Sequence, residues 1–189
     1  MQAQALDGGF ADAPVAAARA FRAVMRAMAR PGSIEQVAGA RPPAPLSVAT
    51  GVLLLTLCDP ETPLYLAGDC DGVAVRDWIS FHTGAPFVGR AQAAFALGGW
   101  EALAPLADYR VGTADYPDRS TTLIVETDLL EARGARLTGP GVAGQAALSL
   151  PEVAAFRANA ARFPMGLDFV FACGNRLAAL PRTTRVEVE

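Results

Sequence analysis

The stretch that decides the fold is Asp168-Phe-Val-Phe-Ala-Cys-Gly-Asn-Arg-Leu-Ala-Ala-Leu180. Two apolar runs flank Gly174-Asn175, and a glycine followed by asparagine is typical of the two-residue turn that joins antiparallel strands. We therefore predict a β-hairpin with strands at Asp168–Cys173 and Arg176–Leu180. Because both runs are strongly apolar, we expect this hairpin to lie in the core.

Hydrophobic spacing and turn residues extend the interpretation outward from the hairpin in both directions. Further strands are expected over residues 33–37, 64–67, 93–97, 120–126, 136–138 and 184–188, and helices over residues 12–30, 46–57, 73–82, 100–106 and 151–162. Helices and strands are mixed along the chain without strict strand–helix–strand alternation. This pattern predicts an α/β fold for residues 1–189, in which one domain contains a mixed sheet flanked by helices.

The composition excludes several classes of protein. Apolar residues make up 52% of the 189 residues and charged residues 19%, which indicates a folded chain. The net charge of −3 argues against a general nucleic-acid binder. The longest nearly unbroken apolar stretch, Val48–Cys58, is too short to cross a membrane, so we expect no membrane association. Three cysteines without paired spacing, Cys58, Cys70 and Cys173, suit a reducing cytoplasm, which is the predicted location.

All 16 basic residues are arginine, and the sequence contains no lysine. Without lysine the chain cannot form a Schiff base with pyridoxal phosphate (PLP), so no such cofactor is expected. One histidine and three scattered cysteines give no ligand-pair spacing, so we expect no metal site. The lone histidine, His82, lies at the end of a predicted helix without the nucleophile motif of a triad enzyme. We interpret it as structural, with a catalytic role as the alternative.

Two further patterns leave alternatives open. The first helix carries an apolar face (Phe21, Val24, Met25 and Met28) and an opposite stripe of arginines (Arg19, Arg22, Arg26 and Arg30). This stripe is either a solvated face or a docking surface for an acidic partner or a phosphate group. Gly139–Gly144 matches Gly-x-Gly-x-x-Gly, but no suitable helix follows it, so a turn is favoured over a phosphate-binding loop.

The remaining polar candidates are weaker, apart from one tetrad. Asp69–Gly72 resembles the start of a calcium loop but has the wrong spacing, which indicates a turn. Asp115 and Asp118 could pair for acid–base chemistry, although nothing places them in a cleft. The tetrad is Arg182-Thr183-Thr184-Arg185, beside the bend expected at Pro181. Its guanidinium and hydroxyl groups either bind an anion or a partner, or satisfy the edge of a sheet.

Short stretches along nearly the whole chain match a known protein family in their order and spacing. The main group is Phe163-Pro-Met-Gly-Leu-Asp168, Cys173-Gly174, Arg176-Leu177 and Leu180-Pro-Arg-Thr-Thr-Arg-Val-Glu-Val188. Earlier stretches are Phe21-Arg22, Ala27-Met28, Pro31-Gly32, Leu54-Leu-Thr-Leu57, Thr62-Pro63, Phe81-His-Thr83, Ala85-Pro86 and Leu137-Thr-Gly139 with Gly141. On these stretches the chain resembles the PhnH family, the H subunit of the bacterial carbon–phosphorus lyase system. Gly98–Arg119 shows no match.

The resemblance implies a fold like that of PLP-dependent transferases but without the cofactor, a homodimer in isolation, and a core complex with the G, I and J subunits. In that family the G, H, I and L subunits support transfer of a phosphonate onto the ribose of ATP with loss of adenine, which yields ribose 1-methylphosphonate 5-triphosphate. The chemistry is ascribed to the I subunit, and no catalytic residue is carried over to this chain. The expected function is therefore that of a non-catalytic subunit in phosphonate catabolism. The alternative is a nucleotide- or phosphonate-binding module that presents its ligand to the I subunit.

Overall fold

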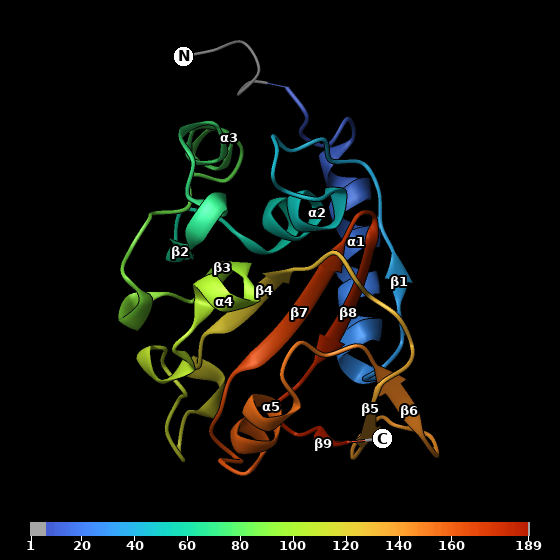
Figure 1. Ribbon diagram of the computed structural model, residues 1–189. Helices are drawn as coiled ribbons and strands as arrows, with labels where there is room; N and C mark the ends of the chain where they lie inside the picture. Colours follow the sequence, from blue (N-terminus) through green and yellow to red (C-terminus); the bar gives the residue numbers. More distant parts are fainter. Residues whose placement is uncertain (1–6, 189) are drawn as a thin grey trace.

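The computed structural model describes residues 7–188, and a six-stranded sheet runs through its centre (Figure 1). The strand order is β1-β8-β7-β4-β3-β2, in which β2, β3, β4 and β7 are parallel. β8 is antiparallel to β7, and β1 is antiparallel to β8. The predicted α/β architecture with a mixed sheet is thus confirmed. The strands are β1 (Glu35–Gln36), β2 (Leu64–Leu66), β3 (Phe95–Gly99), β4 (Thr122–Glu126), β7 (Asp168–Cys173) and β8 (Arg176–Leu180).

The hairpin predicted from the sequence is present with the expected bounds. β7 and β8 pair from Phe169 opposite Leu180 to Cys173 opposite Arg176, and Gly174-Asn175 forms the turn. Gly174 has a φ of 59°, a left-handed conformation that glycine adopts without strain. This hairpin joins the parallel part of the sheet to the terminal strand β1.

A second, three-stranded antiparallel sheet was not anticipated. It has the order β6-β5-β9 and consists of β5 (Ala135–Thr138), β6 (Ala146–Leu148) and β9 (Arg185–Glu187). β5 and β9 correspond to strands that the sequence predicts, whereas β6 does not. The sequence of β6, Ala-Ala-Leu, contains no β-branched or aromatic residue, so its strand signal is weak.

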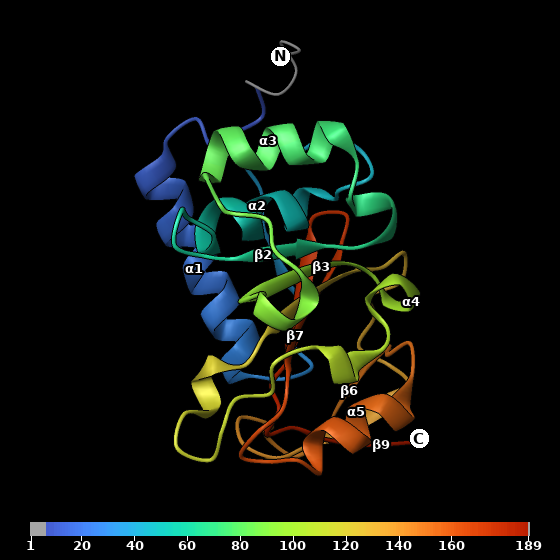
Figure 2. The ribbon, with the colours of Figure 1, turned by 90° about the vertical axis from the view of Figure 1, so that its left-hand side faces the viewer.

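The helices lie on both sides of the six-stranded sheet (Figures 1 and 2). α1 (Ala13–Ala29), α2 (Val48–Leu57) and α3 (Val73–Thr83) pack on one face, whereas α4 (Trp100–Leu103), α5 (Val153–Ala160) and the small sheet cover the other. Both views place α2 and α3 together at one end of the molecule and α5 at the opposite end. Short 3₁₀ turns occur at Gly68–Cys70, Arg90–Gln92, Leu106–Asp108 and Pro117–Arg119. Within residues 7–188, no helix has both the length and the apolar character needed to cross a membrane.

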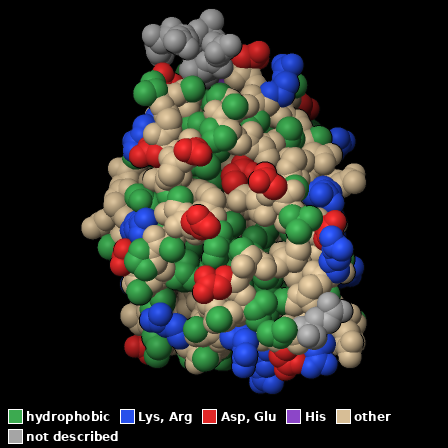
Figure 3. Space-filling view, in the orientation of Figure 1, with side chains coloured by type: hydrophobic (Ala, Val, Ile, Leu, Met, Phe, Trp, Pro, Cys, Tyr) green, Lys and Arg blue, Asp and Glu red, His purple; other side chains and the backbone are tan. Residues whose placement is uncertain are grey.

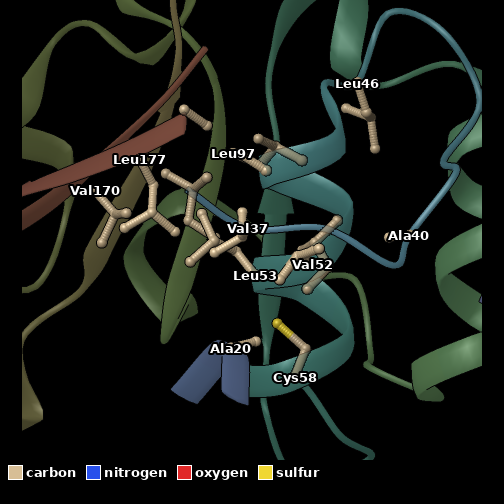
Figure 4. Close-up of a cluster of buried hydrophobic side chains, with 14 of the residues drawn as sticks. Ala20, Val37, Ala40, Leu46, Val52, Leu53, Cys58, Leu97, Val170 and Leu177 are labelled. Atoms are coloured by element: carbon tan, nitrogen blue, oxygen red, sulfur yellow. The ribbon is translucent and has the colours of Figure 1, made fainter. Parts of the chain in front are cut away.

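Alternation along the central strands divides the buried side chains into two cores. Val170 of β7 and Leu177 of β8 point to the side of α1 and α2, where Leu53 of α2 packs close to them (Figure 4). Phe169 and Phe171 point to the other side and join a cluster with Phe156 of α5. Strands that are covered on both faces carry apolar residues at nearly every position. This explains the two continuous apolar runs of the hairpin.

The buried face of α1 differs from the predicted one. Val24 faces the core as expected, but Phe21 and Met25 are 48% and 52% exposed. The buried face instead consists mainly of small residues, namely Ala20, Ala23, Val24 and Ala27. Such residues let a helix approach its neighbours closely, and α1 packs against both α2 and β8. Phe21 and Met25 therefore remain at the surface, whereas Met28 is partly buried against the core.

Candidate functional site

The Arg182–Arg185 tetrad occupies the connection between β8 and β9, directly after Pro181. The Arg182 guanidinium forms an ion pair with the Asp168 carboxylate at the start of β7, and both side chains are well buried, with 12% and 14% exposure. The backbone N–H of Arg182 donates to Asp168 Oδ1 at 2.8 Å, and its Nε donates to the same oxygen at 3.2 Å. Nη1 of Arg182 donates to the Pro117 carbonyl oxygen. The Arg182 side chain therefore links β7, β8 and the Pro117–Arg119 turn.

The other three residues of the tetrad do not converge with Arg182 on one point. Thr184 is buried, and its hydroxyl has no hydrogen-bond partner among the described residues. Arg185 begins β9, pairs with Thr138 of β5 and exposes its side chain. This geometry supports the interpretation in which the tetrad satisfies hydrogen-bonding groups at the edge of a sheet. Anion or partner binding by Arg182, Thr183, Thr184 and Arg185 stays a prediction.

Gly139–Gly144 connects β5 to β6 and lies next to the C-terminal end of α1. No helix follows the loop directly, because β6 begins at Ala146. Gly141 has a φ of 79°, and a Cβ atom placed on it would lie 2.0 Å from the Ala29 carbonyl oxygen. The glycine therefore lets this turn pack against the end of α1. The structure thus shows the favoured turn.

Gly141→Ala is expected to destabilise the chain more than Gly144→Ala. Both glycines have a φ of 79°, but a Cβ on Gly144 would meet no atom within 4 Å. Gly144→Ala therefore carries only the left-handed backbone cost, roughly 1–2 kcal/mol. Gly141→Ala adds a backbone clash, so we expect a further loss of about 1–3 kcal/mol in the free energy of unfolding. Urea denaturation of both variants measures the difference, and equal losses would contradict this account of the loop.

His82 lies in the last turn of α3 and belongs to an aromatic group. Its ring is 4.8 Å from the ring of Trp78 and 4.9 Å from that of Phe81, measured between centroids. Nε2 of His82 is 3.3 Å from the Asp7 carbonyl oxygen, which also accepts a hydrogen bond from Trp78. These contacts support the structural interpretation of His82, because they tie the end of α3 to the segment before α1.

A hollow of about 690 Å³ lies where the parallel strands β2, β3 and β4 end. In α/β sheets, ligands commonly bind at the carboxyl ends of parallel strands. Its lining includes Asp69, Glu101, Glu126 and Asp128, and no Arg or His stands among the lining residues that the structure describes. In Figure 3, acidic side chains gather in the middle of the face shown in Figure 1. The charge of this hollow disfavours phosphate groups.

Glu126 ends β4 and reaches the start of α2. Its Oε1 accepts a hydrogen bond from the backbone N–H of Ser47 at 2.7 Å, and Ser47 caps α2 through the backbone N–H of Thr50. Burial raises the pKa of Glu126 above its usual value of 4.5, although hydrogen bonds from Thr50 and Ser47 oppose this change. Cys70, also in the lining, is buried, and this burial raises the pKa of its thiol to about 11. Sequence motifs did not indicate Glu126, because its partners lie far away in the chain.

Glu126 is expected to make the chain less stable as the pH rises. Its pKa is higher in the folded than in the unfolded state, so the folded state binds more protons in the window that begins near pH 4.5. The contribution of this group is therefore fully present below that pH and declines as the pH rises through the folded pKa. Glu126→Gln should flatten this part of the stability profile, as measured by urea denaturation across the window. Glu101→Gln, which removes an exposed carboxylate from the same hollow, serves as the control.

The remaining acidic candidates are not gathered into one site. Gly68–Cys70 forms a 3₁₀ turn, and Asp71 accepts a hydrogen bond from Arg76 at 2.5 Å, as expected for a turn rather than a calcium loop. Asp115 and Asp118 are both exposed; Asp118 lies within the Pro117–Arg119 turn and Asp115 precedes it. Among residues 7–188, no group of three or more His, Cys, Asp or Glu residues is arranged to hold a metal ion.

The arginine stripe of α1 borders a second hollow, of about 560 Å³. Arg19, Arg22 and Arg26 line it on the helix side, and residues 36–39 line the opposite side. Arg26 forms an ion pair with Glu35 at 2.6 Å, whereas the structure shows no ion pair to Arg19 or Arg22 from the carboxylates of residues 7–188. Of the basic clusters that the sequence indicates, this one is open to solvent.

Comparison with known proteins identifies the family. A family model described as "Bacterial phosphonate metabolism protein (PhnH)" matches residues 8–187. The chain belongs to the PhnH family. The family resemblance inferred from the sequence is thus confirmed, and the match includes Gly98–Arg119, for which the sequence alone showed no counterpart.

Two relatives extend this result. The chain is 40% identical over 197 residues to "Alpha-D-ribose 1-methylphosphonate 5-triphosphate synthase subunit PhnH" of Rhizobium meliloti (strain 1021), with 100% of this chain and 98% of the relative covered. It is 27% identical over 178 residues to "Putative C-P lyase subunit protein HtxG" of Stutzerimonas stutzeri, with 90% and 85% covered. Both relatives are named as subunits, one of a synthase and one of a C-P lyase.

Proposed function

We propose that this chain is the H subunit of an α-D-ribose 1-methylphosphonate 5-triphosphate synthase and that it supports the reaction through protein contacts rather than chemistry of its own. The observation that carries the proposal is the 40% identity to the Rhizobium meliloti subunit over the whole length of both proteins. In this role the chain takes part in the catabolism of organic phosphonates within a carbon–phosphorus lyase system.

The local surroundings of the polar candidates support a non-catalytic role. Arg182 is engaged with Asp168 and Pro117, and His82 packs among aromatic rings beside a backbone carbonyl. The absence of lysine from the sequence rules out a Schiff base to PLP. We further propose a fold related to that of PLP-dependent transferases without the cofactor, a homodimer in isolation, the G, I and J subunits as partners, and a location in the cytoplasm.

Co-expression with the G, I and J subunits of the same system tests this function. We expect the chain to co-purify with them and to restore growth on methylphosphonate as the phosphorus source in a strain that lacks its own H subunit. His82→Ala should leave this growth unchanged, because the His82 contacts are structural. A chain that purifies alone under gentle salt conditions and fails to restore growth would contradict the proposal.

A second candidate function is a module that binds a nucleotide or phosphonate and presents it to the I subunit. The hollow at the ends of β2, β3 and β4 favours this candidate by its position, while its four carboxyl groups disfavour an anionic ligand. Calorimetry of the isolated chain with ATP and with methylphosphonate separates the two functions. Heat of binding at millimolar ligand that disappears in a variant of the hollow, such as Trp100→Ala, would support this candidate, and no heat would remove it.

A further inference from the structure

The groove between α1 and β1 combines three features that point to one kind of partner. Its floor and helix side consist of Ala16, Ala20 and Ala23 with the arginine side chains above them, and its other side is the chain from Gln36 to Gly39. The groove follows the terminal strand of the six-stranded sheet, since β1 pairs with β8 and with no other strand of residues 7–188. Figure 1 shows β1 beside α1 at the margin of the molecule, and Figure 3 shows basic side chains along the same margin.

The first feature is positive charge without an ion-pair partner in the part of the chain that the structure describes. Arg19 and Arg22 are exposed and lie three residues apart on α1, so their positions are about 5–6 Å apart along one side of the helix. Arg26 extends the row, but its charge is balanced by Glu35. Side chains on the same side of an extended strand repeat every ~6.6–6.8 Å. Carboxylates at alternate positions of such a strand therefore match the spacing of the two free guanidinium groups.

The second feature is an unpaired backbone edge. The Val37 N–H donates to the Asn175 carbonyl oxygen at 2.9 Å, so the backbone of Val37 faces β8. Because N–H and C=O groups alternate in direction along a strand, those of Gln36 and Ala38 face away from β8 and along the groove. Gln36, Ala38 and Gly39 are exposed. An exposed sheet edge of this kind readily accepts a further strand from another chain.

The third feature is the apolar lining of the groove itself. Beside the arginines, the groove is lined by alanines of α1 (Ala16, Ala20 and Ala23) and, on the other side, by Val37 and Ala38. Apolar side chains of an extended segment can pack on this lining, whereas a free phosphate group gains nothing from apolar neighbours. This combination favours a protein partner over a small anion.

We propose that the groove between α1 and β1 binds an extended, acidic segment of another protein, which adds a strand beyond β1 and places its carboxylates on Arg19 and Arg22. This inference deepens the proposed function, since the segment is expected to belong to a subunit of the synthase. Main-chain hydrogen bonds at Gln36 and Ala38 supply affinity, and the two arginines select for acidic residues.

A defined peptide tests the groove without the other subunits. The probe is fluorescein-labelled Val-Glu-Val-Glu-Val-Glu-Val, capped at both ends, and the control peptide carries lysine in place of each glutamate. We expect the full chain to bind the acidic peptide only, with slower hydrogen exchange at the amides of Gln36 and Ala38. The double variant Arg19→Glu/Arg22→Glu should weaken binding about tenfold or more. The matched control is Arg157→Glu/Arg162→Glu, which reverses two exposed arginines at α5, and it should bind as the wild type does.

Several outcomes would overturn the inference. Three of them are equal binding of both peptides, unchanged exchange at Gln36 and Ala38, and binding of inorganic triphosphate that displaces the peptide from Arg19 and Arg22. The fourth is a wild-type dimer that becomes a monomer in the Arg19→Glu/Arg22→Glu variant, because the groove would then hold a second copy of this chain. Co-purification separates this inference from the proposed function. If wild-type chain assembles with its partner subunits and the Arg19→Glu/Arg22→Glu variant assembles equally well, the groove is not the contact. If the wild type does not assemble although it binds the acidic peptide, the proposed function fails and the groove stands.

Discussion

Arg182→Ala is expected to lower the free energy of unfolding by about 3–5 kcal/mol, because it leaves the Asp168 carboxylate buried without its partner. The ion pair lies where the first residue of β7 meets the residue after the Pro181 bend, and Asp168 also accepts the backbone N–H of Arg182. Removing the guanidinium also frees the Pro117 carbonyl oxygen. The loss should therefore appear both in global stability and in local opening of the Pro117–Arg119 turn.

Urea denaturation measures the global effect, and hydrogen exchange measures the local one. Arg185→Ala is the matched control, because Arg185 belongs to the same tetrad but exposes its side chain; we expect a change within about 0.5 kcal/mol. Asp168→Asn should cost less than Arg182→Ala, since the amide oxygen still accepts from the backbone of Arg182. A wild-type-like Arg182→Ala variant that fails only in assembly would instead show that Arg182 contacts a partner or an anion.

Phe169→Ala is expected to cost about 3–5 kcal/mol of stability as well. The Phe169 side chain is fully buried on β7, and its ring centroid lies 4.9 Å from that of Phe156 in an edge-to-face arrangement. Trp100 of α4 packs on the same group, with its ring centroid 4.8 Å from that of Phe156. Truncating Phe169 therefore leaves a cavity between the sheet, α4 and α5.

Thermal and urea unfolding of the variant give the size of this effect. Phe163→Ala is the comparison, because Phe163 is 61% exposed and should contribute about 0.5 kcal/mol or less. Phe169→Leu retains most of the apolar volume and should recover a substantial part of the loss. Equal stability of Phe169→Ala and Phe163→Ala would mean that packing in the aromatic cluster contributes little to the stability of the fold.

Local sequence signals predict most elements of this fold. The Gly174-Asn175 turn and its flanking apolar runs define the central hairpin, and the Asp12 side chain caps α1 where the sequence suggests a helix start. These local signals fail where long-range packing determines the structure. β6 is held by pairing with β5 rather than by its own residues, and the spacing of Phe21 and Met25 does not reveal that alanines form the buried face of α1.

The candidate sites likewise combine features that the local sequence shows with contacts that it does not show. The arginine stripe was visible from spacing, because residues three and four apart lie on one side of a helix. The stripe borders a groove because β1, which is held in place by pairing with β8, lies beside α1. The sequence alone does not show this neighbour. The engagement of Arg182 by Asp168, which lies 14 residues earlier, likewise depends on the hairpin, and the contact of Glu126 with Ser47 spans 79 residues. Such contacts follow from the tertiary fold and have no local signature.

The strict alternation of β7 constrains how this protein can change in length. Phe169 and Phe171 serve one core while Val170 and Ala172 serve the other, so losing or gaining one residue inside the strand would exchange the two sets. Such a change would place phenylalanine rings among the tightly packed alanines of α1. The tip of the hairpin is fixed as well, because the Gly174 carbonyl oxygen accepts from the Ala49 N–H and the Asn175 carbonyl oxygen accepts from the Val37 N–H, each at 2.9 Å. Insertions and deletions are therefore expected to disrupt the fold within the strands of this hairpin, and an insertion at its tip would displace the contacts with α2 and β1.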